Sequence, residues 1–270
     1  SLEYPPTRTV DVVEDYHGTP VADPYRWLED TSSAETGAWV EAQNAVTLPY
    51  LHALPEREAL RTRLEALYDY ERYSRPWKEG GLTFYTYNTG LQDQSVLYVA
   101  PRPEAPGRVL LDPNTLSEDG TVALTSTAVS PDGRYLGYGL ASAGSDWQEF
   151  RVRDVETGQD LEDHIQWVKF SGMSWTQDGA GFFYSRYPRP TEAGDELLDA
   201  NRNQMLYYHR LGTAQSEDRR VLEFPDHPDW FINAEVTEDG RYALLTISSS
   251  TDEENRLYVL DLEDPQAPRL

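Results

Sequence analysis

The sequence has no cysteine, which excludes disulfide-stapled folds, thiolate zinc sites, iron–sulfur clusters and cysteine nucleophiles. It also lacks any apolar run near the ~18 residues that a membrane-spanning helix needs. The first residues, Ser1-Leu2-Glu3-Tyr4-Pro5-Pro6, show no basic and then apolar leader. These absences predict a chain without a membrane partner. The expected location is cytoplasmic, or periplasmic or secreted if a leader was removed before residue 1.

Lysine is also scarce: of 23 cationic residues only Lys78 and Lys169 are lysine, which leaves 23 − 2 = 21 arginines. The 47 acidic residues outnumber the cations, and the formal net charge of −24 argues against nucleic acid or anionic membranes as partners. Two interpretations of this balance stay open: a coding bias with a solvated surface, and adaptation to high salt. With 12% aromatic residues, the chain is expected to fold.

Residues 1–72 show helical patterns. The segment 30–33, Asp-Thr-Ser-Ser, offers oxygen atoms for a helix N-cap, and residues 34–47 follow without an interior proline. Pro55 suits the first turn of a second helix. The apolar stripes of the two helices fall at Trp39, Val40, Gln43 and Val46, and at Leu60, Leu64 and Leu67. Little within this segment is expected to cover these faces, so the helices need a partner surface.

From about Arg75 the pattern becomes strand-like and repeats four times. Three of the repeats begin with Asp-Gly, which favours the positive φ angles of a tight turn, and β-forming residues follow. The matching glycines at 81, 133, 179 and 240 stand 52, 46 and 61 residues apart. A second strand follows each repeat, and its markers Leu97, Phe150, Leu206 and Leu257 stand 53, 56 and 51 residues apart.

A period of about 50 residues built from short strands is typical of a β-propeller with one blade per repeat. Four blades can be counted, the last of them cut at Leu270. A propeller ring closes with more blades in most cases, and an open arc would leave sheet edges bare. The sequence therefore predicts a mainly β fold, with a helical segment at 1–72 and an incomplete β-propeller at 73–270.

The longest irregular stretch is 187–203, which contains two prolines, a glycine and four acidic residues. Loops of this length are usually either functional or disordered. A mobile surface loop and a gating or contact role both stay open.

Catalytic motifs are missing. The sequence has no Gly-x-Ser-x-Gly nucleophile elbow, no His-Glu-x-x-His, no Gly-x-Gly-x-x-Gly and no phosphate-binding loop. The five histidines are scattered without metal-ligand spacing, so neither a metal nor a cofactor is expected. The chain alone shows no self-sufficient catalytic apparatus.

Several stretches carry a resemblance to a known family. Residues 15–30, Asp-Tyr-His-Gly-Thr-Pro-Val-Ala-Asp-Pro-Tyr-Arg-Trp-Leu-Glu-Asp, resemble the N-terminal signature of the prolyl oligopeptidases. Further similar stretches follow in the family's order, at 87–92, 111–114, 144–147, 168–175 and 211–218. The ordered set covers essentially the whole chain and is far more specific than any one fragment.

The resemblance implies a serine peptidase that cuts short peptides after proline. In that family a seven-bladed propeller caps an α/β-hydrolase domain, and the opening helical segment packs on the hydrolase. Helices 34–67 would then bury their stripes on a later part of the same protein, which would also complete the ring. The family's Ser, Asp and His triad lies in that later part, so no catalytic residue is assigned to this chain. The implied partners are proline-containing peptides and the hydrolase portion.

The resemblance also implies substrate-facing residues. Apolar propeller residues of the family line the pocket for the substrate residue two places before the proline, and Phe170, Phe231 and Thr251 fall at such positions. Threonine departs from the family, where this position is often a thiol or apolar. From the sequence alone, Phe170 and Phe231 could equally be strand core. The propeller would cover the site and exclude folded proteins, and the loop 187–203 corresponds to a family loop at the domain interface, which favours gating.

Two other functions stay open. One is a relative of the same family that joins peptide ends into macrocycles, whose distinguishing residues would lie in the hydrolase portion. The other is a propeller fragment that acts alone as a binding module, against which the uncovered helices and open blades argue.

Overall fold

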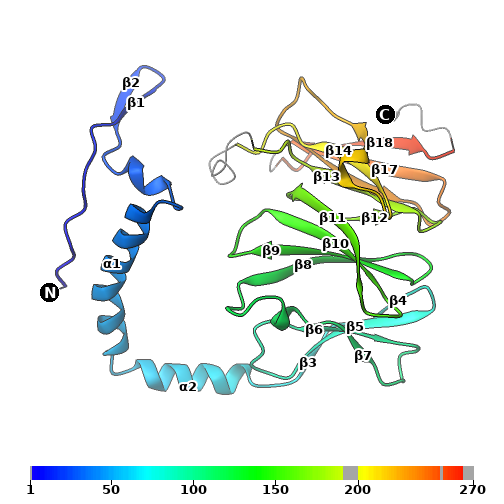
Figure 1. Cartoon of the computed structure of the whole chain (residues 1–270), viewed down its shortest axis with the longest axis horizontal. Helices are drawn as coiled ribbons and strands as arrows, with labels where there is room; N and C mark the ends of the chain where they lie inside the picture. Colours follow the sequence, from blue (N-terminus) through cyan, green and yellow to red (C-terminus); the bar gives the residue numbers. More distant parts are fainter. Residues whose placement is uncertain (1, 191–199, 250–251, 264–270) are drawn as a thin grey trace. The chain divides into compact units, whose positions relative to one another are not determined.

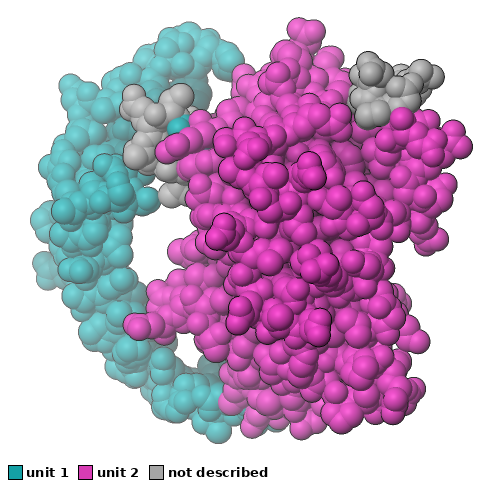
Figure 2. All heavy atoms as spheres, turned by 45° about the vertical axis from the view of Figure 1, so that its right-hand side comes forward, with its two compact units in different colours: residues 1–68, 190–199 teal, residues 69–189, 200–270 magenta. Residues whose placement is uncertain are grey.

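The computed structural model describes residues 2–190, 200–249 and 252–263. Antiparallel β-strands make up most of the regular structure in these ranges, accompanied by two α-helices (Figure 1). The chain divides into two compact units, residues 1–68 with 190–199 and residues 69–189 with 200–270, which Figure 2 colours separately. The mainly β fold predicted from the repeats is confirmed.

The first unit contains a hairpin, a 3₁₀ turn and two helices: β1 (Val13–Tyr16), β2 (Thr19–Ala22), η1 (Arg26–Glu29), α1 (Ala34–His52) and α2 (Arg57–Tyr68). Helix α1 begins as predicted, because the Ser33 hydroxyl accepts a hydrogen bond from the Thr36 N–H at 3.1 Å. It continues past Thr47 and through Pro49, whose carbonyl accepts the Ala53 N–H at 3.1 Å. Among the described residues, no helix is long and apolar enough to cross a membrane.

The two helices differ in how much of their surface is covered. The extended residues 4–8 run beside α1, where Tyr4 and Thr47 share a 3.3 Å hydrogen bond and the Trp39 indole donates to the Thr7 hydroxyl at 2.9 Å. Helix α1 therefore has more cover within the unit than the sequence indicated. On α2 the predicted stripe is exposed by 61%, 54% and 48% at Leu60, Leu64 and Leu67.

The second unit holds the predicted repeats as successive antiparallel groups of strands, called blades below (Figure 1). Blade 1 consists of β4 (Trp77–Glu79), β5 (Leu82–Asn88), β6 (Val96–Ala100) and β7 (Arg108–Leu111), and β3 (Arg72–Tyr73) also pairs with β5. Blade 2 consists of β8 (Val122–Val129), β9 (Tyr135–Ser142), β10 (Gln148–Asp154) and β11 (Asp160–Val168). Short 3₁₀ turns lie at η2 (Pro113–Thr115) and η4 (Gln215–Glu217).

The two remaining blades follow the same order. Blade 3 consists of β12 (Ser174–Trp175), β13 (Gly181–Arg186), β14 (Met205–Arg210) and β15 (Arg219–Leu222). Blade 4 is described over β16 (Trp230–Val236), β17 (Tyr242–Ser249) and β18 (Asn255–Asp261). One bridge, Val168 opposite Arg186, connects β11 to β13, so blades 2 and 3 share a hydrogen-bonded sheet.

The hydrophobic core lies between consecutive blades. Each of three buried clusters takes its members from two neighbouring blades, which explains why a single blade has no core of its own. Fully buried representatives of the three clusters are Phe84 with Leu136, Phe150 with Phe182, and Leu206 with Leu245.

The three Asp-Gly sequences form the same turn in blades 2, 3 and 4. In each, the aspartate carboxylate accepts a 2.6 Å bond from a hydroxyl two residues earlier and a bond of 3.0 to 3.1 Å from the N–H two residues later. The glycines have positive φ, as predicted: 76° at Gly133, 65° at Gly179 and 71° at Gly240. Local sequence thus specifies these turns completely.

Candidate functional site

The structure brings two of the predicted substrate-facing residues together. Phe170 lies two residues after β11, and Phe231 is the second residue of β16. Their rings meet edge to face, with centroids 5.8 Å apart and planes at 81°. Phe170 is 44% exposed and Phe231 is partly buried, so Phe170 lies at the surface of its unit and outside the strand core. Thr251 lies outside the described residues.

The backbone that carries Phe170 has an unusual conformation. Phe170 has φ +55° and Trp167, three residues earlier, has φ +63°. Bulky residues rarely adopt this left-handed region, and each instance costs about 1–3 kcal/mol that the surroundings must offset. The segment 167–170 therefore needs specific contacts to hold it.

Two buried polar side chains supply those contacts. Gln204, which is 2% exposed, donates to the Lys169 carbonyl at 3.0 Å and accepts the Ile232 N–H at 2.7 Å. Ser185 donates to the Ile232 carbonyl at 2.5 Å, and its own N–H donates to the Ser171 hydroxyl at 2.8 Å. The Gln204 side chain therefore joins the backbone beside Phe170 to the backbone beside Phe231. Ser185 adds a bond on each side, through its hydroxyl to Ile232 and through its N–H to the Ser171 side chain.

A group of aromatic rings surrounds Lys169. Its ammonium lies 4.9 Å from the ring centroid of Trp147 and 5.5 Å from that of Phe170, both within the range of cation–π attraction. Trp147 in turn meets Trp167 at 5.9 Å and Tyr187 at 6.1 Å, both edge to face. Burial raises the pKa of Tyr187, whose hydroxyl has no hydrogen-bond partner within the described ranges.

A cavity of about 210 Å³ adjoins this group; it is lined by Leu140, Ser142, Ser145, Trp147, Gln148, Glu149, Gln166 and Trp167. Burial opposes ionisation of Glu149, but hydrogen bonds from His164 at 2.7 Å and Gln166 at 3.2 Å keep its pKa below the usual value.

In the part of the chain that the structure describes, no hydrogen bond joins a serine to a histidine, and no group of three acidic or histidine side chains is arranged to hold a metal ion.

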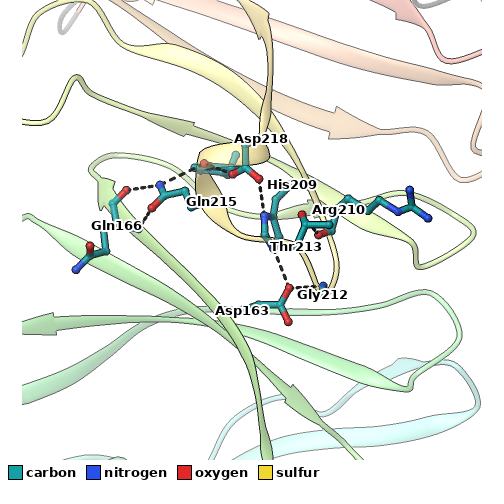
Figure 3. Close-up of polar contacts among 9 residues, drawn as sticks. Asp163, Gln166, His209, Arg210, Gly212, Thr213, Gln215 and Asp218 are labelled. Atoms are coloured by element: carbon teal, nitrogen blue, oxygen red, sulfur yellow. Dashed lines mark hydrogen bonds and ion pairs between the residues drawn. The ribbon is translucent and has the colours of Figure 1, made fainter.

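A second polar cluster is fully buried between blades 2 and 3 (Figure 3). His209 on β14 bonds through Nδ1 to Asp218 at 2.7 Å and through Nε2 to Asp163 of β11 at 2.9 Å. The Gly212 N–H donates to Asp163 at 2.6 Å, and the Tyr184 hydroxyl donates to the other oxygen of Asp218 at 2.6 Å. Residues that are far apart in the sequence thus join two blades through charged bonds.

Electrostatics keep this cluster charged. Burial alone would lower the pKa of His209, but the bonds to Asp163 and Asp218 outweigh it and raise that pKa to about 9. Burial likewise opposes ionisation of Asp163, yet the bonds from His209 and the Gly212 N–H hold its pKa below the usual value. His209 has no exposed atom and both its ring nitrogens are occupied, so it is a structural link and has no free nitrogen to act as a base.

Blades packed around shared cores, preceded by a helical segment, define the class of protein as a β-propeller protein with an N-terminal extension. The chain matches the family model described as prolyl oligopeptidase, N-terminal beta-propeller domain, over residues 5–270. It belongs to the prolyl oligopeptidase family, as the resemblance predicted.

Relatives agree with this assignment. A prolyl endopeptidase of Elizabethkingia meningoseptica is 41% identical over 265 residues, which cover 97% of this chain and 37% of the relative. A dual function macrocyclase-peptidase of Amanita bisporigera is 35% identical, with 96% of this chain and 39% of the relative covered. The chain thus spans little more than a third of the length of these relatives.

Solved structures of the same family also match nearly all of this chain and little more than a third of their own length. Prolyl oligopeptidase B from Galerina marginata, bound to a 35mer hydrolysis and macrocyclization substrate, matches with a TM-score of 0.79 and 35% identity, over 96% of this chain and 39% of that one. A structure from a study of inter-domain dynamics in two prolyl endopeptidases matches with a TM-score of 0.66 and 42% identity, over 97% of this chain and 37% of that one.

Sequence reasoning selected Phe170 and Phe231 but missed the residues that support them. Gln204 and Ser185 are ordinary polar residues in the sequence, and nothing in their spacing points to Phe170. Lys169 carried a signal, since it is one of two lysines in an arginine-rich chain. His209 stands just before the family-like stretch 211–218, but its two carboxylate partners are 46 and 9 residues away.

Proposed function

We propose that this chain is the N-terminal portion of a serine-type prolyl oligopeptidase that hydrolyses short peptides on the C-terminal side of proline. The observation that carries the proposal is the family match over residues 5–270, in a chain that covers 37% of a prolyl endopeptidase. The catalytic Ser, Asp and His belong to the remaining part, where the Ser attacks the prolyl carbonyl and the His transfers the proton.

Residues 1–72 form, in this proposal, a segment that packs on the hydrolase portion, and residues 73–270 form the first part of the propeller. Two exposed leucines of α2 support it, because Leu60 and Leu64 line an apolar groove that nothing in the described unit covers. The propeller limits access to the active site by size and shelters the reaction from bulk water. We assign the protein to the cytoplasm and expect it to need no metal or other cofactor.

The proposed substrate surface is Phe170, Phe231 and Thr251, facing the peptide residue two places before the proline. Its support is the edge-to-face pair of rings, in which Phe170 is 44% exposed, and the buried Gln204 side chain that bonds the backbone next to Phe170. Aromatic rings of this kind bind apolar side chains by contact and by exclusion of water.

The test uses the full-length protein that contains this chain, assayed with a chromogenic Gly-Pro substrate and with a tripeptidyl substrate that ends in proline. We expect cleavage after proline, and Phe170→Ala should raise KM for the longer substrate roughly tenfold, in line with the loss of 1–2 kcal/mol of buried aromatic contact. Leu91→Ala, which truncates a side chain that is 56% exposed in a loop of blade 1, is the matched control. Unchanged kinetics of Phe170→Ala on the longer substrate would remove Phe170 from the site.

A second activity, macrocyclisation of peptides, is favoured by one observation: relatives that are 35% identical are named dual function macrocyclase-peptidases. Mass spectrometry of the products distinguishes hydrolysis from macrocyclisation, because a cyclic product is lighter than its linear form by one water.

The binding-module alternative predicts instead that the native polypeptide ends at Leu270 and is monodisperse and stable without a hydrolase portion. The mass of the native polypeptide decides between a peptidase and a binding module.

A further inference from the structure

Lys169 is a buried cation that forms no ion pair with any acidic side chain of residues 2–190, 200–249 or 252–263. The residue is 9% exposed, yet the ion pairs within the described ranges all use arginine or histidine as the cation. Burying an ammonium group is costly unless other groups compensate for the lost water. In this case the compensation comes from the ring faces of Trp147 and Phe170, at 4.9 Å and 5.5 Å.

The position of this charge is fixed. Gln204 holds the Lys169 carbonyl. Phe170, the next residue, has a left-handed backbone, and its ring packs against Phe231. Burial of the Lys169 side chain and its contacts with the rings of Trp147 and Phe170 keep the ammonium beside Phe170, whereas an exposed lysine would sample many rotamers in water. A fixed, poorly hydrated charge acts on its neighbours much more strongly than a charge in water does.

The charge also lies close to the place where a peptide would bind. A substrate side chain in contact with the exposed face of Phe170 would lie within about 9 Å of Nζ, since packed carbon atoms are about 3.5–4 Å apart and Nζ is 5.5 Å from the ring centroid. An acidic side chain there gains attraction, and a basic one meets repulsion across a partly dry surface. The effect on selectivity comes as much from the repulsion as from the attraction.

We propose that Lys169 determines charge specificity at the Phe170–Phe231 pair, favouring a peptide with an acidic side chain over one with a basic side chain at the position that contacts Phe170. This proposal rests on the proposed peptidase function. It runs against the overall charge of −24, which by long-range steering would favour cationic peptides. Local and global electrostatics therefore predict opposite preferences, which makes the proposal easy to test.

The experiment compares three peptides on the full-length enzyme, identical except for Glu, Gln or Lys two places before the proline. We expect kcat/KM to fall in the order Glu, Gln, Lys, with about a tenfold range that lies mainly in KM, allowing for solvent at the edge of the surface. This comparison needs no variant. Equal values, or a preference for Lys, overturn the proposal.

Variants then locate the source of the preference. Lys169→Met keeps the length of the side chain without its charge and should bring the Glu and Lys peptides to within about twofold, whereas Lys169→Arg should retain the preference. Lys78→Met is the matched control, because Lys78 is the other lysine of the chain and is exposed on β4. If Lys169→Met slows all three peptides equally, Lys169 serves only to position the rings and the proposal fails. If the wild-type protein cleaves none of them, the proposed peptidase function fails first.

Discussion

The Asp163–His209–Asp218 cluster and the Phe170–Phe231 pair both connect one blade to another, but they do so with opposite chemistry. The cluster uses charged hydrogen bonds, and its histidine has no exposed atom. Asp163 and His209 stand on regular strands, and Asp218 follows the turn η4. The ring pair is partly exposed, stands on a left-handed backbone and is held by neutral hydrogen bonds from Gln204 and Ser185.

The two places therefore differ in what they offer: the cluster stabilises the fold, and the ring pair is, in our proposal, a surface for peptide binding. A buried charged link is costly to disturb and offers nothing to a ligand, because both ring nitrogens of His209 already have partners. An exposed apolar pair on a strained segment contributes less to folding and leaves a face free for contact. Substitutions in the two places should therefore affect different measurements.

The largest effect is expected from His209→Ala. Removing the imidazole leaves Asp163 and Asp218 buried without their shared cation, which costs about 3–5 kcal/mol of unfolding free energy. Denaturant unfolding of the protein measures this loss. His164→Ala is the matched control: its imidazole also contacts a carboxylate, Glu149 at 2.7 Å, but it is 33% exposed, so its loss should cost under about 1 kcal/mol. Equal losses for the two variants would contradict the buried-link interpretation.

The contribution of the same cluster to the unfolding free energy should depend on pH. The folded pKa of His209 is raised to about 9, above the ordinary value of 6.5, so its stabilising effect is complete below about pH 6.5 and is lost as pH rises through 9. The difference in unfolding free energy between the wild type and His209→Gln should thus shrink between about pH 6.5 and 9.5, by up to about 3 kcal/mol. A difference that stays constant over this window would show that His209 is neutral in the fold, because the stability effect of a neutral histidine changes only below about pH 6.5.

A smaller loss is expected from Gln204→Ala, but with a functional consequence. The Ile232 N–H and the Lys169 carbonyl would each lose a buried partner, at about 1–3 kcal/mol of unfolding free energy. Because the backbone beside Phe170 is then released, KM for a tripeptidyl substrate should rise about threefold or more.

Gln94 offers a matched control for this variant. Its amide bridges blades 1 and 2 in the same manner, donating to the Val122 carbonyl at 2.6 Å and accepting the Leu124 N–H at 3.0 Å. Gln94→Ala should lower stability by a similar amount and leave KM unchanged. If both variants raise KM equally, Gln204→Ala acts through a general loosening of the propeller and not through the position of Phe170.

Features set by local sequence could be predicted. The Ser33 cap and the Asp-Gly turns depend on residues within a few positions of one another, so the sequence alone located them. The blade count followed from the spacing of similar strands. The cover on α1 was missed because it comes from an extended segment some 30 residues away that has no periodic pattern.

The site was predicted only in part, and for a similar reason. Phe170 and Phe231 were selected by resemblance to a family, and no rule of spacing would have paired them. The contacts that hold them depend on strand register: Gln204 stands just before β14 and reaches Lys169, 35 residues earlier, only because β13 and β14 are paired as they are. Likewise, the two carboxylates of His209 come from different blades, and their burial is a product of how the blades pack.

The repeated turn also explains how the repeats tolerate different lengths. The turns of neighbouring blades touch: a β-carbon at Gly80 would collide with the Gly133 nitrogen, and one at Gly240 would lie 2.7 Å from the side chain of Gln177. In blades 2, 3 and 4 the hydrogen-bonded loop closes over the same number of residues, from Ser130 to Tyr135, Thr176 to Gly181 and Thr237 to Tyr242. These turns act as spacers of constant size along one edge of the arc. Differences in repeat length therefore fall in the other connections, and a tag or reporter inserted by design belongs there too.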